Sequence, residues 1–284
     1  MVPAAFDYHR ASSAAEALDL LDAYPGAKLL AGGHSLLPMM KLRLTQPGTL
    51  IDIGRLDELR GIRESRNSFR IGSLTTHAAV AGSDPLRAGC PILAEAAAEI
   101  ADPQVRNKGT IGGNLAHADP ASDLPAVLVA LGATIHMRSK GEARSVAAAD
   151  FFVGLLTTSL AAHEIMTEIE IPRLGAGTGS AYLKVEHPAS GYAVCGAAAI
   201  LTIDGGTCSS ASLTFNGVTA TPHQASAVAG ALVGTSADDA AIDRAIEKLE
   251  LLDTLSDDYA SGEFRAALAT AYGKRALKAA RDRA

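Results

Sequence analysis

The sequence predicts an α+β protein, in which a two-part α/β region is followed by a small antiparallel sheet and then by helices. Up to about residue 174, short apolar strand candidates alternate with helical segments. Three strand candidates then follow one another without a helix between them, and the chain beyond Thr221 has helical spacing. A glycine-rich linker at 174–180 separates the two regions. We therefore expect structural units at 1–54, 55–174 and 178–284.

The first unit is predicted to be a small α/β module. A Ser-Ser pair can cap a helix over Ala14 to Ala23, which the Pro-Gly pair that follows would end. Apolar residues at 28–30 and 50–53 predict two short strands, each followed by glycine. The segment from Leu36 to Leu44 mixes apolar and basic residues, and its pattern leaves helix and extended chain both open.

The second unit is predicted to combine strands with longer helices. Ser68 to Gly72 forms a strand pattern, and Pro91 to Ile100 a helical one. We expect an irregular stretch from Asp102 to Ser122, then a helix that begins at Asp123 and ends at Gly132. Alternating apolar and polar residues predict further strands at 133–137 and 164–171.

The third unit is predicted to be an antiparallel sheet with helices. Asp204-Gly205-Gly206 is a strong hairpin signal, because a tight turn between strands needs residues that accept positive φ. The expected strands are 181–185, 195–203 and 209–215, and the helical segments include AIDRAIEKLELL and GEFRAALATAYGKRALKAARD.

Composition excludes several classes of protein. Apolar residues make up 48% of the 284 residues and charged residues 20%, as in an ordinary globular protein. The net charge of −6 argues against a nucleic-acid binder, which usually has a basic excess. No run of 18 apolar residues predicts a membrane span, and MVPAAFDYHR lacks the apolar core of a signal peptide. We expect a cytoplasmic protein.

Cysteine and histidine spacing predicts no metal site in this chain. The three cysteines, Cys90, Cys195 and Cys208, are scattered and form no CxxC pair. An iron–sulfur cluster needs about four thiolates. The eight histidines show no HExxH or similar ligand spacing.

Two segments with Gly-Gly pairs are the candidates for ligand binding. Glycine allows close backbone approach, and successive free N–H groups form a concave site suited to phosphate oxygens. Neither segment matches GxGxxG after a strand or GxxxxGK[ST], so Rossmann and P-loop sites are disfavoured. Each can also be a plain turn; together they favour a diphosphate-containing cofactor. The segments are Ala31, Gly32, Gly33, His34 and Ser35, and Thr110, Ile111, Gly112, Gly113 and Asn114.

These segments carry a family resemblance. AGGHSLLPMMKLRL and TIGGNLAHADPASDLPAVLVALGA closely resemble the FAD-binding medium subunit of the carbon monoxide dehydrogenase and xanthine dehydrogenase (molybdenum hydroxylase) family. The resemblance continues through EIMTEIEIP and AYLKVEHPASGYAVCGAAA to the helical tail, and so covers nearly the whole chain. It implies a two-part FAD-binding domain of the vanillyl-alcohol-oxidase (PCMH) type, followed by the C-terminal domain of the medium subunit.

The resemblance also implies roles for individual residues. Both glycine segments would wrap the FAD pyrophosphate and ribityl chain, and Asp123 would bind adenosine or ribityl hydroxyls. Ile100 and Met166 would flank the isoalloxazine ring, Lys184 would lie near its polar edge, and Tyr192 would cover it. No residue is expected to be catalytic.

Simpler roles remain open for three of these residues. Asp123 precedes Leu-Pro at a helix start and can be an N-cap. Lys184 lies in an alternating strand and can be a solvated lysine; near a flavin, its charge would instead stabilise the reduced form. Tyr192 can be an ordinary half-buried tyrosine. His34 and His117 are interpreted as hydrogen-bonding residues, because flavin electron transfer needs no side-chain base.

The function implied is an FAD-dependent electron-transfer subunit of a molybdenum hydroxylase. It would take electrons from two [2Fe-2S] clusters on a small iron–sulfur partner and pass them to an external acceptor. A large partner would hold the molybdenum-pterin, in a dimer of heterotrimers. A stand-alone FAD oxidoreductase and a non-catalytic assembly protein are the alternatives. The substrate stays open between carbon monoxide, a purine, an N-heterocycle and an aldehyde. The electron acceptor stays open between quinone, NAD and oxygen. Association with the inner face of a membrane through the acceptor stays open too.

Overall fold

The N-terminal unit is a parallel sheet with one helix against it. In the computed structural model, which describes residues 1–284, the sheet order is β1-β3-β2 and both pairings are parallel. Helix α1 buries its apolar stripe against β3, and the Ser13 hydroxyl accepts a hydrogen bond from the Glu16 amide at its start. The sequence left helix and extended chain both open for the segment after the first Gly-Gly pair, and the structure forms a helix there. The elements are β1 (Asp7–Arg10), α1 (Ala14–Ala23), β2 (Lys28–Leu30), α2 (Leu36–Lys41), β3 (Thr49–Asp52) and the 3-10 turn η1 (Asp57–Leu59).

Strand β1 was not predicted, because its sequence, DYHR, has no apolar face. Its residues are exposed or half-buried, and it exists through its hydrogen bonds to β3. Helix α1 matches the predicted bounds, and the strand predicted at 28–30 is confirmed.

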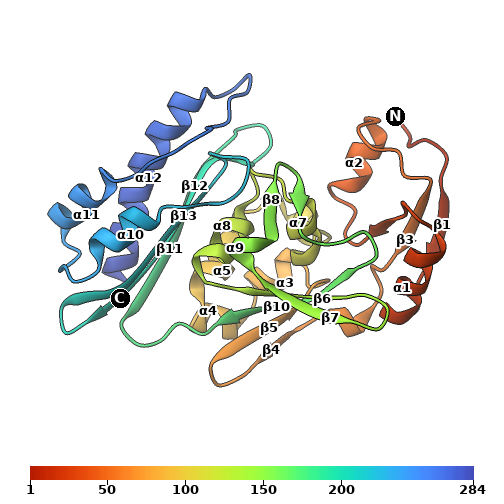
Figure 1. Cartoon of the computed structure of the whole chain (residues 1–284), viewed down its shortest axis with the longest axis horizontal. Coiled ribbons are helices and arrows are strands. Elements are labelled where there is room, and N and C mark those ends of the chain that lie inside the picture. The colour runs from red at the N-terminus through yellow and green to blue at the C-terminus, as the bar shows by residue number, and fades with distance from the viewer.

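The middle unit is a five-stranded sheet that carries helices (Figure 1), in the order β4-β5-β10-β6-β7 with every pairing antiparallel. Its core of 32 buried residues gathers the apolar side chains of the sheet and of the helices on it. The predicted strands and the helix from Pro91 are confirmed. The strands are β4 (Ile62–Glu64), β5 (Ser68–Gly72), β6 (Thr134–Arg138), β7 (Ala143–Ala147) and β10 (Ile165–Pro172). The helices are α3 (His77–Ala81), α4 (Asp84–Gly89), α5 (Pro91–Ala98), α8 (Asp123–Ala130) and α9 (Ala148–Phe151). The hairpin strands β8 (Phe152–Gly154) and β9 (Thr157–Thr158) complete the unit.

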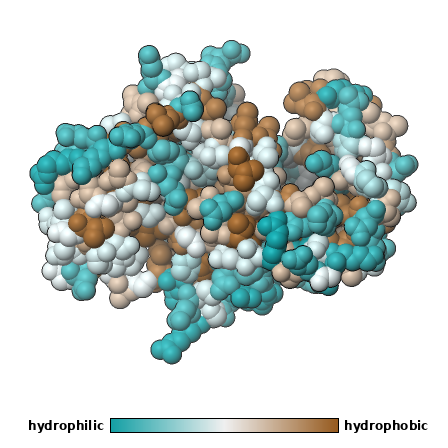
Figure 2. Space-filling view, viewed as in Figure 1, coloured by the Kyte–Doolittle hydropathy of each residue, from teal (hydrophilic) through white to brown (hydrophobic).

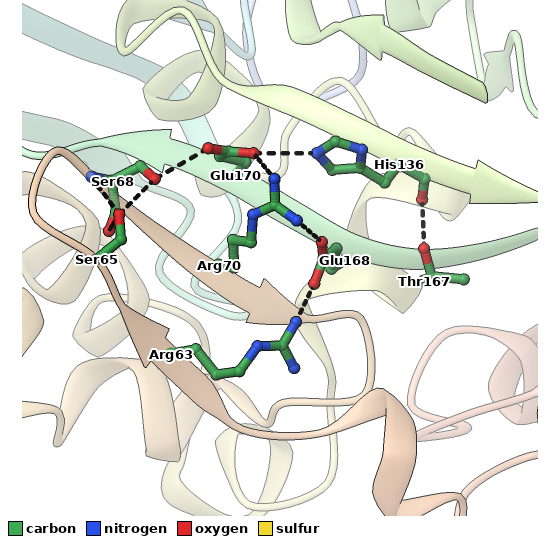
Figure 3. A network of polar contacts seen from close by, with 8 residues as sticks. All are labelled: Arg63, Ser65, Ser68, Arg70, His136, Thr167, Glu168 and Glu170. Atoms are coloured by element: carbon green, nitrogen blue, oxygen red, sulfur yellow. Dashed lines mark hydrogen bonds and ion pairs between the residues drawn. The ribbon is translucent and has the colours of Figure 1, made fainter. Parts of the chain in front are cut away.

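Charged side chains form a ladder across four strands of this sheet, β4, β5, β10 and β6 (Figure 3). Glu168 on β10 pairs with Arg63 and with Arg70, whose Nη1 lies 3.0 Å from Oε1. Glu170 pairs with Arg70 at 2.8 Å and with His136 at 3.4 Å. The isoleucines that alternate with these glutamates are fully buried, so the predicted half-buried strand is confirmed.

The stretch from Asp102 to Ser122, predicted as irregular, contains two short helices, so that prediction is wrong there. They are α6 (Pro103–Arg106) and α7 (Ile111–His117). Asp102 and Thr110 each cap a helix through the side chain, accepting from Val105 and Gly113 amides. Two glycines in the first turn of α7 disguise its helical character in the sequence.

The C-terminal unit is an antiparallel sheet in the order β11-β12-β13-β14, packed against the long helix α12 (Figure 1). The predicted strands and hairpin are confirmed; Gly205 and Gly206 connect β12 to β13 with φ of +54° and +80°. Tyr182 and Ala198 join the core of the middle unit. The elements are β11 (Thr178–Glu186), β12 (Ala193–Asp204), β13 (Thr207–Asn216), β14 (His223–Gln224), α10 (Ser226–Leu232), α11 (Asp239–Ile246) and α12 (Gly262–Asp282).

Hydrophobic side chains gather in three clusters, mostly from the N-terminal strands and α1, from the middle sheet and its helices, and from the C-terminal sheet and α10–α12. The division at 1–54, 55–174 and 178–284 stays a prediction. None of the helices has the length and apolar character needed to span a membrane. No group of three or more His, Cys, Asp or Glu side chains is arranged to hold a metal ion.

Candidate functional site

A cavity of about 730 Å³ lies where the three units meet. Its walls come from the β2–α2 turn, from the β5–α3 and α7 segments, from the β8–β9 hairpin and from residues 190–192 of the C-terminal unit. The molecular surface is notched between the N-terminal unit and the rest of the protein (Figure 2). Cofactor sites usually have volumes of about 300–1,000 Å³, so the cavity suits a cofactor.

The first glycine segment presents backbone donors in the cavity wall. Strand β2 ends in a turn where Gly33 has φ of +74°, and α2 begins two residues later. The amide N–H groups of residues 32 to 36 have no acceptor within the chain. The His34 ring donates from Nδ1 to the Gly32 carbonyl at 2.9 Å and so folds back on its own turn. Five successive free amides in residues that line a cavity form an anion-binding wall.

The second glycine segment has no such run of free amides, and the expectation that it would present successive ones is wrong. Thr110 caps α7, accepting from the Gly113 amide through its hydroxyl and from the Asn114 amide through its carbonyl. The Ile111 and Gly112 amides donate to the carbonyls of Thr75 and Ser73. A Cβ on Gly112 would lie 2.6 Å from that of Ser73, so this glycine is required by packing.

The two glycine segments touch. A Cβ on Gly32 would collide with the Lys108 carbonyl and lie 2.9 Å from the Cα of Gly109. A Cβ on Gly113 would lie 3.9 Å from that of Ala31. The segments therefore form one wall of one cavity, the first supplying donors and the second a close-fitting glycine surface.

Three buried polar atoms in cavity-lining residues have no partner in the chain. They are Ser73 Oγ, His77 Nδ1 and Asn114 Oδ1. An unpaired buried polar atom costs about 1–3 kcal/mol, which a ligand that bonds to it recovers. Sequence reasoning missed Ser73 and His77. The only local feature before them is Gly72, at the end of an apolar strand, and one glycine does not distinguish a cavity from a plain turn.

Burial lowers the pKa of His77 to about 4, and the nearby Arg106 charge acts in the same direction. Because this folded-state pKa lies below the ordinary 6.5, protonation favours the unfolded chain. The contribution of neutral His77 to the free energy of unfolding is fully present above pH 6.5 and is lost as the pH falls toward 4. We expect wild type to lose about 2 kcal/mol more free energy of unfolding than a His77→Leu variant between pH 7.5 and pH 5.0. Urea unfolding at both pH values measures this; equal losses in the two proteins would contradict it.

Asp123 belongs to a buried polar cluster and is not an N-cap. Ser122 holds the N-cap position of α8, and Asp123 follows inside the first turn with 4% of its surface exposed. It accepts a hydrogen bond from the Tyr182 hydroxyl at 2.6 Å and pairs with Lys184 at 3.2 Å. Burial raises the pKa of Asp123 to about 6, although the Lys184 charge and the Tyr182 hydrogen bond oppose the rise. The carboxylate is therefore mainly ionised at neutral pH.

Lys184 is not a solvated strand lysine, because its side chain is only 2% exposed. It also does not line the cavity. Its ammonium group donates to the carbonyl oxygens of Glu99 at 2.6 Å and Gly191 at 2.9 Å, besides Asp123. Lys184 thus lies behind the cavity wall that Asp123 forms.

The far part of the cavity is apolar. Ile100 and Met166 line it and are almost fully buried, next to Leu160 and Ile165. Tyr192 also lines it and is 43% exposed. Of the predicted site residues, Ile111 and Lys184 stay out of the cavity wall, and Ile111 is buried in the core. The structure brings the others together: Ala31, Gly32, Gly33, His34, Ser35, Ile100, Thr110, Gly112, Gly113, Asn114, Asp123, Met166 and Tyr192, together with His117.

These features fit FAD. The free amides of the β2–α2 turn suit a diphosphate, and the unpartnered Ser73, His77 and Asn114 atoms suit ribose or ribityl hydroxyls. The apolar wall at Ile100 and Met166 suits a flat aromatic ring.

Comparison with known families supports the same cofactor. Residues 4–174 match the model of the FAD binding domain in molybdopterin dehydrogenase. Residues 180–280 match the model of the CO dehydrogenase flavoprotein C-terminal domain.

Individual relatives match over their whole length. The carbon monoxide dehydrogenase medium chain of Afipia carboxidovorans is 42% identical, over 100% of this chain and 99% of the relative. Subunit alpha of the 6-hydroxypseudooxynicotine dehydrogenase complex of Paenarthrobacter nicotinovorans is 37% identical, over 100% and 97%. Among solved structures, carbon monoxide dehydrogenase from Hydrogenophaga pseudoflava superposes with a TM-score of 0.97 at 42% identity, covering 100% of this chain and 99% of that one. Quinoline 2-oxidoreductase from Pseudomonas putida 86 gives 0.94 at 34% identity, covering 99% of both.

Proposed function

We propose, because this chain belongs to the family of FAD-binding medium subunits of molybdenum hydroxylases, that it passes electrons from the iron–sulfur clusters of a partner to an external acceptor. Bound FAD supplies the redox chemistry, since it accepts two electrons and releases them. The chain's own residues bind and orient the cofactor. The observation that carries this proposal is the run of five acceptor-free amides at residues 32–36, set in the wall of a cofactor-sized cavity.

Each wall of the cavity has a proposed task. The β2–α2 turn would hold the diphosphate through its amides, and the glycine face of α7 would pack beside it. Asp123 and Asn114 would accept hydrogen bonds from cofactor hydroxyls. Ile100 and Met166 would exclude water from the ring, and Tyr192 would cover it from the C-terminal unit.

The complete complex would contain two further subunits. A large subunit would hold the molybdenum-pterin and oxidise the substrate, and a small subunit would hold two [2Fe-2S] clusters. We propose a dimer of such heterotrimers in the cytoplasm. The named relatives act in enzymes for carbon monoxide, 6-hydroxypseudooxynicotine and quinoline, so the large subunit would select the substrate.

Co-purification tests this function. We expect the tagged chain, expressed from its native host, to elute with two further polypeptides, molybdenum and iron, and to carry about one FAD per chain. A yellow chain that elutes alone would support a stand-alone flavoprotein. A colourless chain in a complex would support an assembly protein. Metal analysis and the flavin absorbance of the same fraction separate the three outcomes.

Lys184 offers a test of cofactor electrostatics. The Lys184→Met variant loses a positive charge behind the cavity wall and leaves the Asp123 carboxylate unpaired. Because negative charge near a flavin disfavours its reduction, the flavin midpoint potential should fall. A spectroelectrochemical titration that gives the wild-type midpoint would discard this role.

A further inference from the structure

The turn at residues 187–192 of the C-terminal unit contributes to the wall of the cavity. Its backbone closes on itself, since the Tyr192 carbonyl accepts from the His187 amide at 2.7 Å and the His187 carbonyl accepts from Gly191 at 2.8 Å. Ser190, Gly191 and Tyr192 line the cavity together with the residues of the β2–α2 turn. The Tyr192 side chain is 43% exposed, so packing alone does not fix its position.

Lys184 ties this turn to the FAD-binding region. It projects from β11, and its three N–H donors meet three acceptors from separate segments. These are the Glu99 carbonyl after α5, the Asp123 carboxylate in the first turn of α8 and the Gly191 carbonyl in the turn. The Lys184 side chain itself is 2% exposed, so its ammonium group depends on these three acceptors in place of water.

The turn lies against the FAD-binding region. A Cβ on Gly191, where φ is +71°, would be in van der Waals contact with the Cα of Ala101, at 3.5 Å. Ala101 itself has φ of +40° and follows the Ile100 that lines the apolar end of the cavity. A shift of the turn therefore moves Tyr192 relative to the wall of the ring site.

We propose that Lys184 is a positioning residue that holds Tyr192 over the cofactor cavity by tying the Gly191 carbonyl to Asp123 and Glu99. This inference rests on the proposed function, because it assigns a cofactor-covering task to Tyr192. Lys184 acts on the cofactor site through the turn and does not itself reach the cavity.

A double-mutant cycle on FAD affinity tests the coupling. We expect Lys184→Met and Tyr192→Ala each to weaken FAD binding by the full-length chain about tenfold, the effect of roughly one lost hydrogen-bonded contact. The variant with both changes should bind no worse than Tyr192→Ala alone, because Lys184 works through that side chain. Additive losses, or no loss in Lys184→Met, would overturn the proposal.

Hydrogen exchange gives a second readout that needs no bound FAD. Amides at 190–191 should exchange about tenfold faster in Lys184→Met and in Lys184→Met/Asp123→Asn, while amides of α10 keep their wild-type rates. The double variant removes the unpaired buried carboxylate and so remains folded if the single one does not. Loosening of α10 to the same extent, or unchanged rates at 190–191, would overturn the proposal.

Lys278→Met is the matched control. Lys278 also pairs with an aspartate of the C-terminal unit, Asp239 at 2.9 Å, but it lies on α12 away from the cavity. Its loss should leave the exchange at 190–191 unchanged. A wild-type chain that binds no FAD would refute the proposed function, whereas the exchange result would still report whether Lys184 holds the turn.

Discussion

Replacing Gly32 with valine is expected to weaken FAD binding by on the order of 2–4 kcal/mol, the cost of forcing a branched side chain into a closely packed site. The new Cβ would collide with the Lys108 carbonyl and crowd the Cα of Gly109, which are backbone atoms that cannot rotate away. The β2–α2 turn would have to separate from the segment before α7, and its five free amides would lose their place in the cavity wall. Calorimetric titration of the apo chain with FAD measures the change.

Gly48→Val is the control for this variant. Gly48 precedes β3 in the same unit, and a Cβ there would meet nothing within 4 Å. It should bind FAD as wild type does. Wild-type affinity in Gly32→Val would show that contact between the glycine segments is not needed for the cofactor.

Gly113 is a weaker test position than Gly32. An added Cβ at Gly113 would crowd only the Thr110 hydroxyl, at 2.9 Å, and a hydroxyl can rotate. We therefore expect a smaller loss of FAD affinity in Gly113→Val than in Gly32→Val, although both glycines stand in similar sequence motifs.

The Lys184→Met variant is expected to lose about 3 kcal/mol of stability at pH 7.5, because removing one partner leaves a buried charge uncompensated. Asp123 would then have only the Tyr182 hydroxyl as a side-chain partner, and keeping its carboxylate charged among buried groups would cost free energy. The loss should shrink toward pH 5, since the carboxyl can take up a proton there. Chemical denaturation at the two pH values measures both effects.

Adding Asp123→Asn to that variant should restore most of the lost stability. The amide is neutral, and its oxygen can still accept the hydrogen bond from the Tyr182 hydroxyl. A double variant as unstable as Lys184→Met alone would mean that the loss comes from packing of the lysine stem and not from the unpaired charge.

Elements with a clear local pattern were predictable, and elements held by distant partners were not. Helix α1 has its cap, its apolar stripe and its Pro-Gly end within residues 13–26, and its bounds matched the prediction. The β12–β13 hairpin was equally clear because Asp-Gly-Gly demands a tight turn. Strand β1 was missed because its hydrogen bonds to β3 come from residues far along the chain.

The candidate site was partly visible in the sequence. Both glycine segments could be identified, because two Gly-Gly pairs beside apolar elements together favour a ligand, although each alone can be a plain turn. The sequence did not show which amides are free. In the second segment four amides donate to Thr110 or to the carbonyls of Ser73 and Thr75, whereas the amides of residues 32 to 36 have no acceptor. Ser73 and His77 escaped because a single preceding glycine gives no sign of a cavity.

Local signals in the chain were enough to indicate the α+β class, the hairpin and helix positions and, through long motifs, the family and its cofactor. Burial was a different matter. From the sequence, Lys184 could be a solvated strand residue or a neighbour of the flavin, and Asp123 a helix cap or a cofactor ligand. Folding placed them 3.2 Å apart and out of water, with Tyr182 beside them. The reason is physical: the charge state and the task of a polar side chain depend on which distant groups remove its water, and residue order does not contain that information.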